Sequence, residues 1–132
     1  MTETLRLPST ADAPPGAVAF VESLCERLAI DEDLASRIAL AAAEAAANAA
    51  EHGNAFADDR DVILSATWDE STFELACEDE GAGLAEDALD DAALPDDPMD
   101  TGGRGLFLIR ALTDEAHVEA QGRRVVMRWT RA

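Results

Sequence analysis

Residues 44–54 read EAAANAAEHGN, so that Glu44, Asn48 and His52 recur at intervals of four among alanines. Alanine favours an α-helix and close packing but supplies no polar side chain. Residues four apart share a face of a helix, so the Glu44 carboxylate and the Asn48 amide can reach a single site. The stretch therefore predicts a tightly packed helix with functional groups on one face, and we interpret His52 as a structural residue at its end.

The sequence before this stretch predicts a strand and two helices. "LRLPS" near the start is typical of a short strand, and Pro14 and Pro15 favour the start of a helix. The apolar residues after them recur at helical spacing: Ala17, Phe20, Val21, Leu24 and Leu28. Asp31 is expected to cap the second helix, which carries the quoted stretch, and His52-Gly53-Asn54 is expected to end it.

From residue 61 the apolar period changes to two, which predicts strands. Residues 62–68 and 73–79 are expected to form a hairpin, with Asp79 on the same face as the apolar residues of its strand. A carboxylate that points inward needs a hydrogen-bond donor. A short helix follows "TGGRG", and strands around residues 117–119 and 125–129 complete one predicted domain of residues 1–132.

The composition is strongly acidic, with a formal net charge of −18 and no lysine among the ten basic residues. A chain without a basic stripe is not expected to bind nucleic acid. Two explanations for the charge stay open, a salt-adapted cytoplasm and a coding bias toward alanine, aspartate and arginine. We find no signal peptide and no membrane span, which favours a cytoplasmic location. Cys25 and Cys77 are expected to be buried thiols and not metal ligands.

Two glycine-containing motifs accompany the helix, Asp79-x-Gly81-x-Gly83 at a strand end and Gly103-x-Gly105 at a helix start. A Walker A loop is excluded because it needs a lysine, and each motif lacks the third glycine of a dinucleotide fingerprint. Glycines at a helix start let backbone N–H groups approach phosphate oxygens. The amide oxygen of Asn48 suits magnesium, and an inward-facing Asp79 can accept a hydrogen bond from an amino group such as that of adenine.

In this order the three motifs resemble the ATP site of the histidine-kinase-like superfamily that includes gyrase and the MutL repair protein. "EAAANAAEHGN", "DEGAGL" and "GGRGLFLIRALTDE" are more closely similar to the stand-alone anti-sigma factor serine/threonine kinases, over roughly residues 14–129. The resemblance implies an α/β (α+β) two-layer sandwich of the Bergerat ATP-binding type. In that fold a mixed, mostly antiparallel sheet carries helices on one face. Residues 84–101 would be a flexible ATP lid.

The resemblance also implies roles for individual residues. Glu44 would be the general base, Asn48 would hold Mg²⁺, and Asp79 would recognise adenine. The remaining predicted site residues would shape the pocket or wrap the phosphates: Gly81, Gly83, Gly103, Arg104, Gly105 and Leu106. Arg104 would face the γ-phosphate, and a salt bridge to the acidic lid is its alternative. Members of the family often carry Gly-Thr where this chain has Gly122-Arg123, so we expect no phosphate contact from that turn.

The resulting hypothesis is a cytoplasmic, homodimeric anti-sigma factor that uses ATP and Mg²⁺ to phosphorylate an antagonist protein on serine or threonine. It would also sequester an RNA polymerase sigma factor. A first alternative is an ATP-binding anti-sigma or partner-switching module without kinase activity. A second is the excised catalytic domain of a histidine kinase. The chain lacks a phospho-accepting histidine helix, and His117 lies in a predicted strand.

Overall fold

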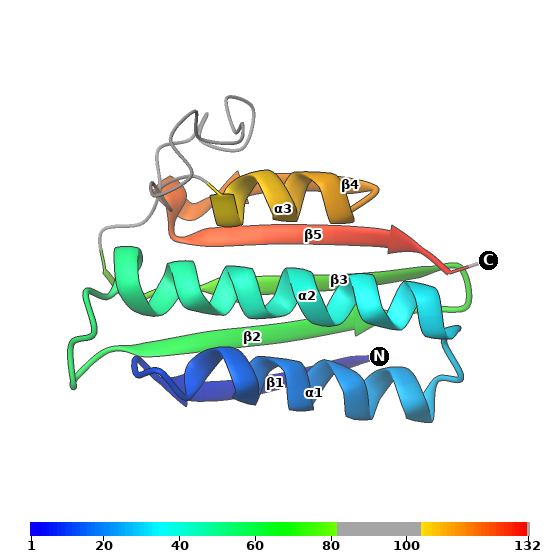
Figure 1. Cartoon of the computed structure of the whole chain (residues 1–132), viewed down its shortest axis with the longest axis horizontal. Helices are drawn as coiled ribbons and strands as arrows, with labels where there is room; N and C mark the ends of the chain where they lie inside the picture. Colours follow the sequence, from blue (N-terminus) through cyan, green and yellow to red (C-terminus); the bar gives the residue numbers. More distant parts are fainter. Residues whose placement is uncertain (82–103, 132) are drawn as a thin grey trace.

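The computed structural model describes residues 1–81 and 104–131, and Figure 1 shows a five-stranded sheet with three α-helices on one face. The order of the strands in the sheet is β1-β2-β3-β5-β4. The elements are β1 (Thr2–Pro8), α1 (Ala13–Arg27), α2 (Glu32–Asn48), β2 (Asp61–Trp68), β3 (Thr72–Glu78), α3 (Arg104–Leu112), β4 (Glu115–Glu119) and β5 (Arg124–Thr130). The predicted two-layer α/β sandwich is confirmed.

All four strand pairs among the described residues are antiparallel, where a mixed and mostly antiparallel sheet was expected. The β2–β3 hairpin forms as predicted, and Ser65 pairs with Ala76 at its centre. Asp69 closes the turn by accepting hydrogen bonds from the backbone N–H groups of Ser71 and Thr72, each at 2.8 Å. Those backbone bonds, followed by bonds from the two hydroxyls, lower the pKa of Asp69 to about 2.

The helical layer has α2 at its centre, between α1 and α3 (Figure 1). Asp31 caps α2 as predicted, because its side chain accepts a hydrogen bond from the Leu34 N–H at 2.7 Å. The alanines of α2 let the helix lie close to its neighbours, and Ala41, Ala42, Ala45 and Ala46 are buried. On the sheet, Phe73 and Trp129 lie side by side with ring centroids 6.2 Å apart. The core therefore lies between the sheet and the helical layer, with α1 as well as α2 contributing buried residues.

The α-helical part of α2 ends at Asn48, and the chain continues as a π-helical turn, Ala49–Gly53. The Asn54 N–H closes this wider turn by donating to the Ala49 carbonyl at 2.8 Å. Figure 1 shows that α2 and β3 end at the same end of the molecule where α3 and β5 begin. The segments that carry the predicted site residues therefore gather at one end of the sheet.

The two cysteines are buried free thiols, as predicted. Burial, together with nearby carboxylates, raises the pKa of Cys25 to about 11 and that of Cys77 to about 12. None of the helices in the described ranges has the length and apolar character needed to cross a membrane. The predicted lid, residues 84–101, lies outside the described residues.

Candidate functional site

Glu44 and Asn48 lie one turn apart near the end of α2, and both side chains face Gly105 in α3. A Cβ atom built on Gly105 would lie 2.9 Å from Glu44 Oε2 and 3.1 Å from Asn48 Nδ2. Only a glycine therefore lets the backbone of α3 come this close to the two polar groups. Packing of α3 on α2 therefore brings Gly105 to Glu44 and Asn48, although it is more than 50 residues away from them in the sequence.

The Asn48 amide has an unmet hydrogen-bonding capacity. Its Nδ2 atom is buried and has no hydrogen-bond partner among the described residues. A buried polar atom without a partner destabilises a protein, and such atoms are rare in native structures. A half-turn of the amide exchanges Nδ2 and Oδ1, so the same position can offer a donor or an acceptor to a ligand. Asn48 thus has the features of a ligand-binding group.

Asp79 follows the last residue of β3 and points inward, as the parity of the strand predicts, with 6% of its surface exposed. Its Oδ1 accepts a hydrogen bond from the Gly81 N–H at 2.9 Å, which supplies the expected donor. Its backbone N–H donates to the Arg123 carbonyl at 2.8 Å. The carboxylate also packs directly on Gly53, where an added Cβ would lie 2.3 Å from Asp79 Cγ.

Asn48 and Asp79 line one narrow pocket between the end of α2 and the sheet. Its other lining residues are small, apolar or in the closing turn: Ala45, Ala49, Gly53, Cys77, Gly122, Arg123 and Val125. A mostly apolar pocket with a few converging polar groups suits a flat heterocycle with an exocyclic amino group. The volume is about 10 Å³, too small for a purine base, so the surrounding segments must move apart to admit one.

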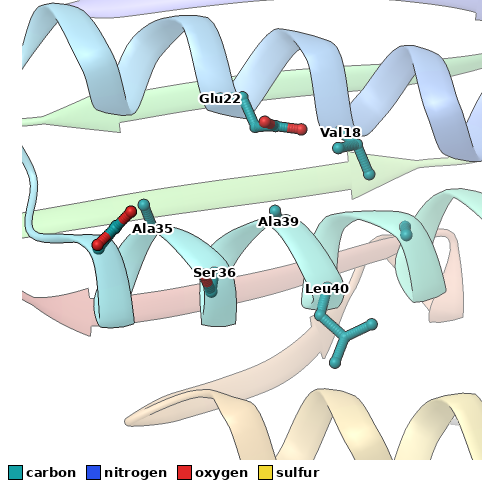
Figure 2. A pocket seen from close by; sticks show the side chains of 8 residues that line it. Val18, Glu22, Ala35, Ser36, Ala39 and Leu40 are labelled. Atoms are coloured by element: carbon teal, nitrogen blue, oxygen red, sulfur yellow. The ribbon is translucent and has the colours of Figure 1, made fainter.

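A wider hollow lies elsewhere on α2, on the outer surface between α1 and α2 (Figure 2). This outer groove has a volume of about 530 Å³ and is lined by Val18, Glu22, Glu32, Ala35, Ser36, Ala39, Leu40 and Ala43. Its floor consists of alanines, and Leu40 at its margin is 45% exposed. None of the predicted site residues that the structure describes lines this groove.

Four residues near the site were not predicted from the sequence. Gly53 and Asn54 had been interpreted only as a helix stop, although they contact the segment after β3. Gly122 and Arg123 line the pocket beside Asp79, where we had expected no phosphate contact because the family's hydroxyl is missing. A signal was available for Gly122, since a glycine before the last strand favours a tight turn, and its φ is 87°.

The remaining predicted residues divide into described and undescribed ones. Gly81 packs against the carbonyl oxygen of Gly53, which an added Cβ would approach to 1.9 Å. Leu106 is half-buried and packs on the core near the start of α3. Gly83, Gly103 and the side chain of Arg104 lie outside the described residues. His52 is exposed in the π-helical turn, and His117 lies in β4, 2.8 Å from Glu119 Oε1.

A magnesium ion at this site would depend on few protein ligands. Within residues 1–81 and 104–131, no group of three or more His, Cys, Asp or Glu side chains could hold a metal ion. Mg²⁺ usually retains several waters and takes phosphate oxygens together with one or two protein oxygens. The partnerless Asn48 amide beside the start of α3 fits that role as a single protein ligand.

Comparison with known proteins supports the resemblance to the histidine-kinase-like superfamily. The family model described as "histidine kinase-like ATPase domain" matches residues 7–129. A search of curated proteins found no match. Among solved structures, the RsbU and RsbW domains of Rv1364c from Mycobacterium tuberculosis match with a TM-score of 0.69 at 17% identity. That match covers 99% of this chain and 32% of the other, and at this identity it shows similarity of fold.

Proposed function

Because this chain belongs to the histidine kinase-like ATPase domain family, we propose that it binds ATP with Mg²⁺ and acts as a protein serine/threonine kinase and anti-sigma factor. The observation that carries the proposal is that Glu44, Asn48 and Asp79 converge at one end of the sheet. ATP binding follows from the family, and the choice of acceptor and partners rests on the sequence motifs.

Adenine would occupy the pocket beside Asp79. The carboxylate accepts a hydrogen bond from the exocyclic amino group, while Ala49, Cys77 and Val125 supply apolar contacts. The thiol of Cys77 stays uncharged because its pKa is raised to about 12. Because Arg123 lines the pocket and is exposed, movement of Arg123 with the closing turn would widen the pocket for entry of the base. Guanine presents a carbonyl oxygen in place of the amino group, so Asp79 should select against it.

The triphosphate would lie where α3 begins, because the N-terminus of a helix favours anions. Gly105 lets the helix backbone approach Asn48, and Gly81 keeps the strand end compact. Mg²⁺, when bound, would neutralise phosphate charge, with Asn48 as its protein ligand. We propose that Gly83, Gly103, Arg104 and Leu106 complete the phosphate site beneath a lid formed by residues 84–101.

Phosphotransfer would use Glu44 as the general base. Its carboxylate takes the proton of a serine or threonine hydroxyl, and the hydroxyl oxygen forms a bond to the γ-phosphorus. The bond between that phosphorus and the bridging oxygen breaks, and ADP leaves with the electron pair. Glu44 is half-buried and faces Gly105, so α3 restricts the directions from which an acceptor hydroxyl can approach it.

The proposed partners are an antagonist protein that receives the phosphate and a sigma factor that the protein sequesters. We also propose that the protein is a homodimer of one-domain chains and acts in the cytoplasm. The restricted access to the half-buried Glu44 favours one competing function, an ATP-binding partner-switching module without kinase activity. Such a module needs a nucleotide pocket but no acceptor beside Glu44.

Transfer of γ-labelled phosphate from Mg·ATP to proteins in an extract of the source cells tests the proposal. We expect one small protein to acquire acid-stable label with the wild type, and Glu44→Gln to abolish labelling while ATP still binds. Glu51→Gln is the matched control, because Glu51 is exposed near the same helix end. Equal labelling by wild type and Glu44→Gln would remove Glu44 as the base. Absence of label with confirmed ATP binding would favour the binding module.

A further inference from the structure

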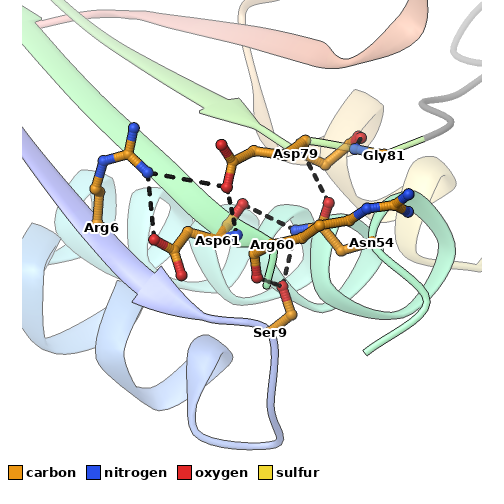
Figure 3. A network of polar contacts seen from close by, with 8 residues as sticks. Arg6, Ser9, Asn54, Arg60, Asp61, Asp79 and Gly81 are labelled. Atoms are coloured by element: carbon orange, nitrogen blue, oxygen red, sulfur yellow. Dashed lines mark hydrogen bonds and ion pairs between the residues drawn. The ribbon is translucent and has the colours of Figure 1, made fainter. Parts of the chain in front are cut away.

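Asn54 is completely buried and uses every hydrogen-bonding atom of its side-chain amide. Its Nδ2 donates to the Asp61 carbonyl and to Ser9 Oγ, both at 2.8 Å, and its Oδ1 accepts from the Glu80 N–H at 2.7 Å (Figure 3). These partners belong to three segments: the one after β1, the start of β2 and the one after β3. A single side chain therefore ties the end of the α2 region to three other parts of the chain.

The direction of each bond is fixed by the network. The Ser9 hydroxyl donates its only hydrogen to the Arg60 carbonyl at 2.6 Å, so Ser9 Oγ can only accept from Asn54 (Figure 3). The Asp61 carbonyl is also an acceptor, so both contacts require the NH₂ end of the amide. The oxygen end must then face the Glu80 N–H. Asparagine satisfies this pattern, and an ionised aspartate would not, because it has no donor.

Gly53 and Asn54 contact three consecutive residues after β3. Gly53 contacts the Asp79 carboxylate and the Cα of Gly81, and Asn54 holds the residue between them, Glu80. The π-helical turn makes these contacts possible. It contains one residue more than an α-helical turn and so shifts the positions of Gly53 and Asn54 by one residue along the chain. Asn48 lies at the start of the π-helical turn, and Asp79 lies in the segment that Gly53 and Asn54 contact. The hydrogen bonds of Asn54 therefore set the separation between Asn48 and Asp79.

We infer that Asn54 is the positioning residue that holds Asp79 in register with Asn48 and so determines both the affinity for ATP and the selection against GTP. This inference rests on the proposed nucleotide function. Removing the Asn54 amide frees the Glu80 N–H and loosens the segment after β3. The carboxylate that selects the base then loses its fixed position, although Asn54 itself does not touch the base pocket.

The test compares nucleotide binding by Asn54→Ala, Asn54→Asp and the wild type. ATP and GTP dissociation constants are measured by calorimetry well below each melting temperature. We expect ATP affinity to fall at least tenfold and the ratio of GTP to ATP dissociation constants to fall toward one. Leu24→Ala is the stability control, because Leu24 is buried in α1 and does not line the pocket. It should lower the melting temperature while both constants stay within twofold of the wild type.

The possible results of this test either support the inference or overturn it. A folded Asn54→Ala variant with wild-type ATP affinity and selectivity would overturn it. If Asn54→Ala does not fold, the Ser9→Ala variant is tested instead. It removes one hydrogen-bond acceptor of Asn54 and leaves the bond from the Glu80 N–H to Asn54 Oδ1. A two- to fivefold loss of ATP affinity in Ser9→Ala would then support the inference, and no change would overturn it. A wild type that binds no ATP would overturn the proposed function and this inference together.

Discussion

Two hollows on the same helix differ in size and in chemistry. The outer groove between α1 and α2 has a volume of about 530 Å³, and the pocket at the end of α2 has about 10 Å³. The outer groove presents alanines, Leu40 and solvent-exposed carboxylates. The small pocket combines a buried carboxylate, an amide with a partnerless Nδ2, and glycines in direct contact with polar atoms. Converging polar groups, and not open volume, distinguish the end of α2 at which we propose the nucleotide site.

The largest effect in this comparison is expected from Asp79→Ala. Removing the carboxylate takes away the hydrogen bond to the adenine amino group, and we expect ATP affinity to fall by roughly 100-fold. Discrimination against GTP should be lost in the same variant. Calorimetric titration of each nucleotide measures both effects. Glu78→Gln is the control, because Glu78 is the preceding residue and points to the other face of β3. Equal losses in both variants would show that overall charge matters and Asp79 does not.

Gly53→Ala should have the next largest effect. The added methyl group would lie 2.3 Å from Asp79 Cγ, so the carboxylate must move, and we expect ATP affinity to fall by roughly tenfold. Gly16→Ala in α1 provides a matched glycine control. Its added methyl group would meet the flexible end of Leu7 at 2.8 Å, and neither residue lines the pocket, so nucleotide binding should be unchanged. Normal ATP binding by Gly53→Ala would show that contact between Gly53 and Asp79 is dispensable.

Cys77 in the pocket wall predicts a loss of stability at alkaline pH. Its pKa is raised from 9.0 to about 12, and that of Cys25 to about 11, so the folded state favours the neutral thiols. The free energy of unfolding should therefore be unaffected below pH 9 and should fall as pH rises from 9 toward 12. Each thiol contributes a slope of up to about 1.4 kcal/mol per pH unit.

The chain contains neither lysine nor tyrosine, so no side chain of these two types titrates in the same pH range as the thiols. Urea unfolding at pH 8, 9 and 10 would measure the slope, and Cys77→Ala should reduce it relative to the wild type. An unchanged slope in Cys77→Ala would contradict burial of this thiol.

The smallest effect is expected from the outer groove. Leu40→Ser removes the exposed apolar side chain at its margin, and ATP affinity should stay within twofold of the wild type. Stability should also change little, since Leu40 is 45% exposed. A tenfold loss of ATP affinity, measured as for the other variants, would assign nucleotide binding to the outer groove and reverse the comparison.

Much of the fold could be predicted because the signals were local. The alternating apolar residues of 62–68 and 73–79 predicted the hairpin and the inward direction of Asp79, and Asp31 predicted the start of α2. Beyond this hairpin, the fully antiparallel pairing of the described strands was not predicted, since it depends on how distant segments meet. The role of the closing turn was not predicted for the same reason. Its Arg123 carries no hydroxyl, but the fold places this residue in the pocket lining.

The site residues were predicted by spacing and by family resemblance, and their contacts were not. No sequence pattern shows that Gly105 faces Glu44, or that Gly53 faces Asp79, because each contact joins elements that are far apart in the chain. Asn54 was missed for a related reason. As the residue after His52-Gly53 it is an ordinary helix stop, and its three hydrogen bonds appear only when the π-helical turn directs it inward.

The most direct test of the account is to map where ATP binds by following backbone amide resonances of the isotope-labelled protein during titration with Mg·ATP. The account predicts the largest shifts at Gly53, Gly81 and Gly122, with little change at Ala35 and Ala39 in the outer groove. Saturable shifts centred on the outer groove, with the three glycines unaffected, would contradict the central claim that the small pocket beside Asp79 binds the nucleotide.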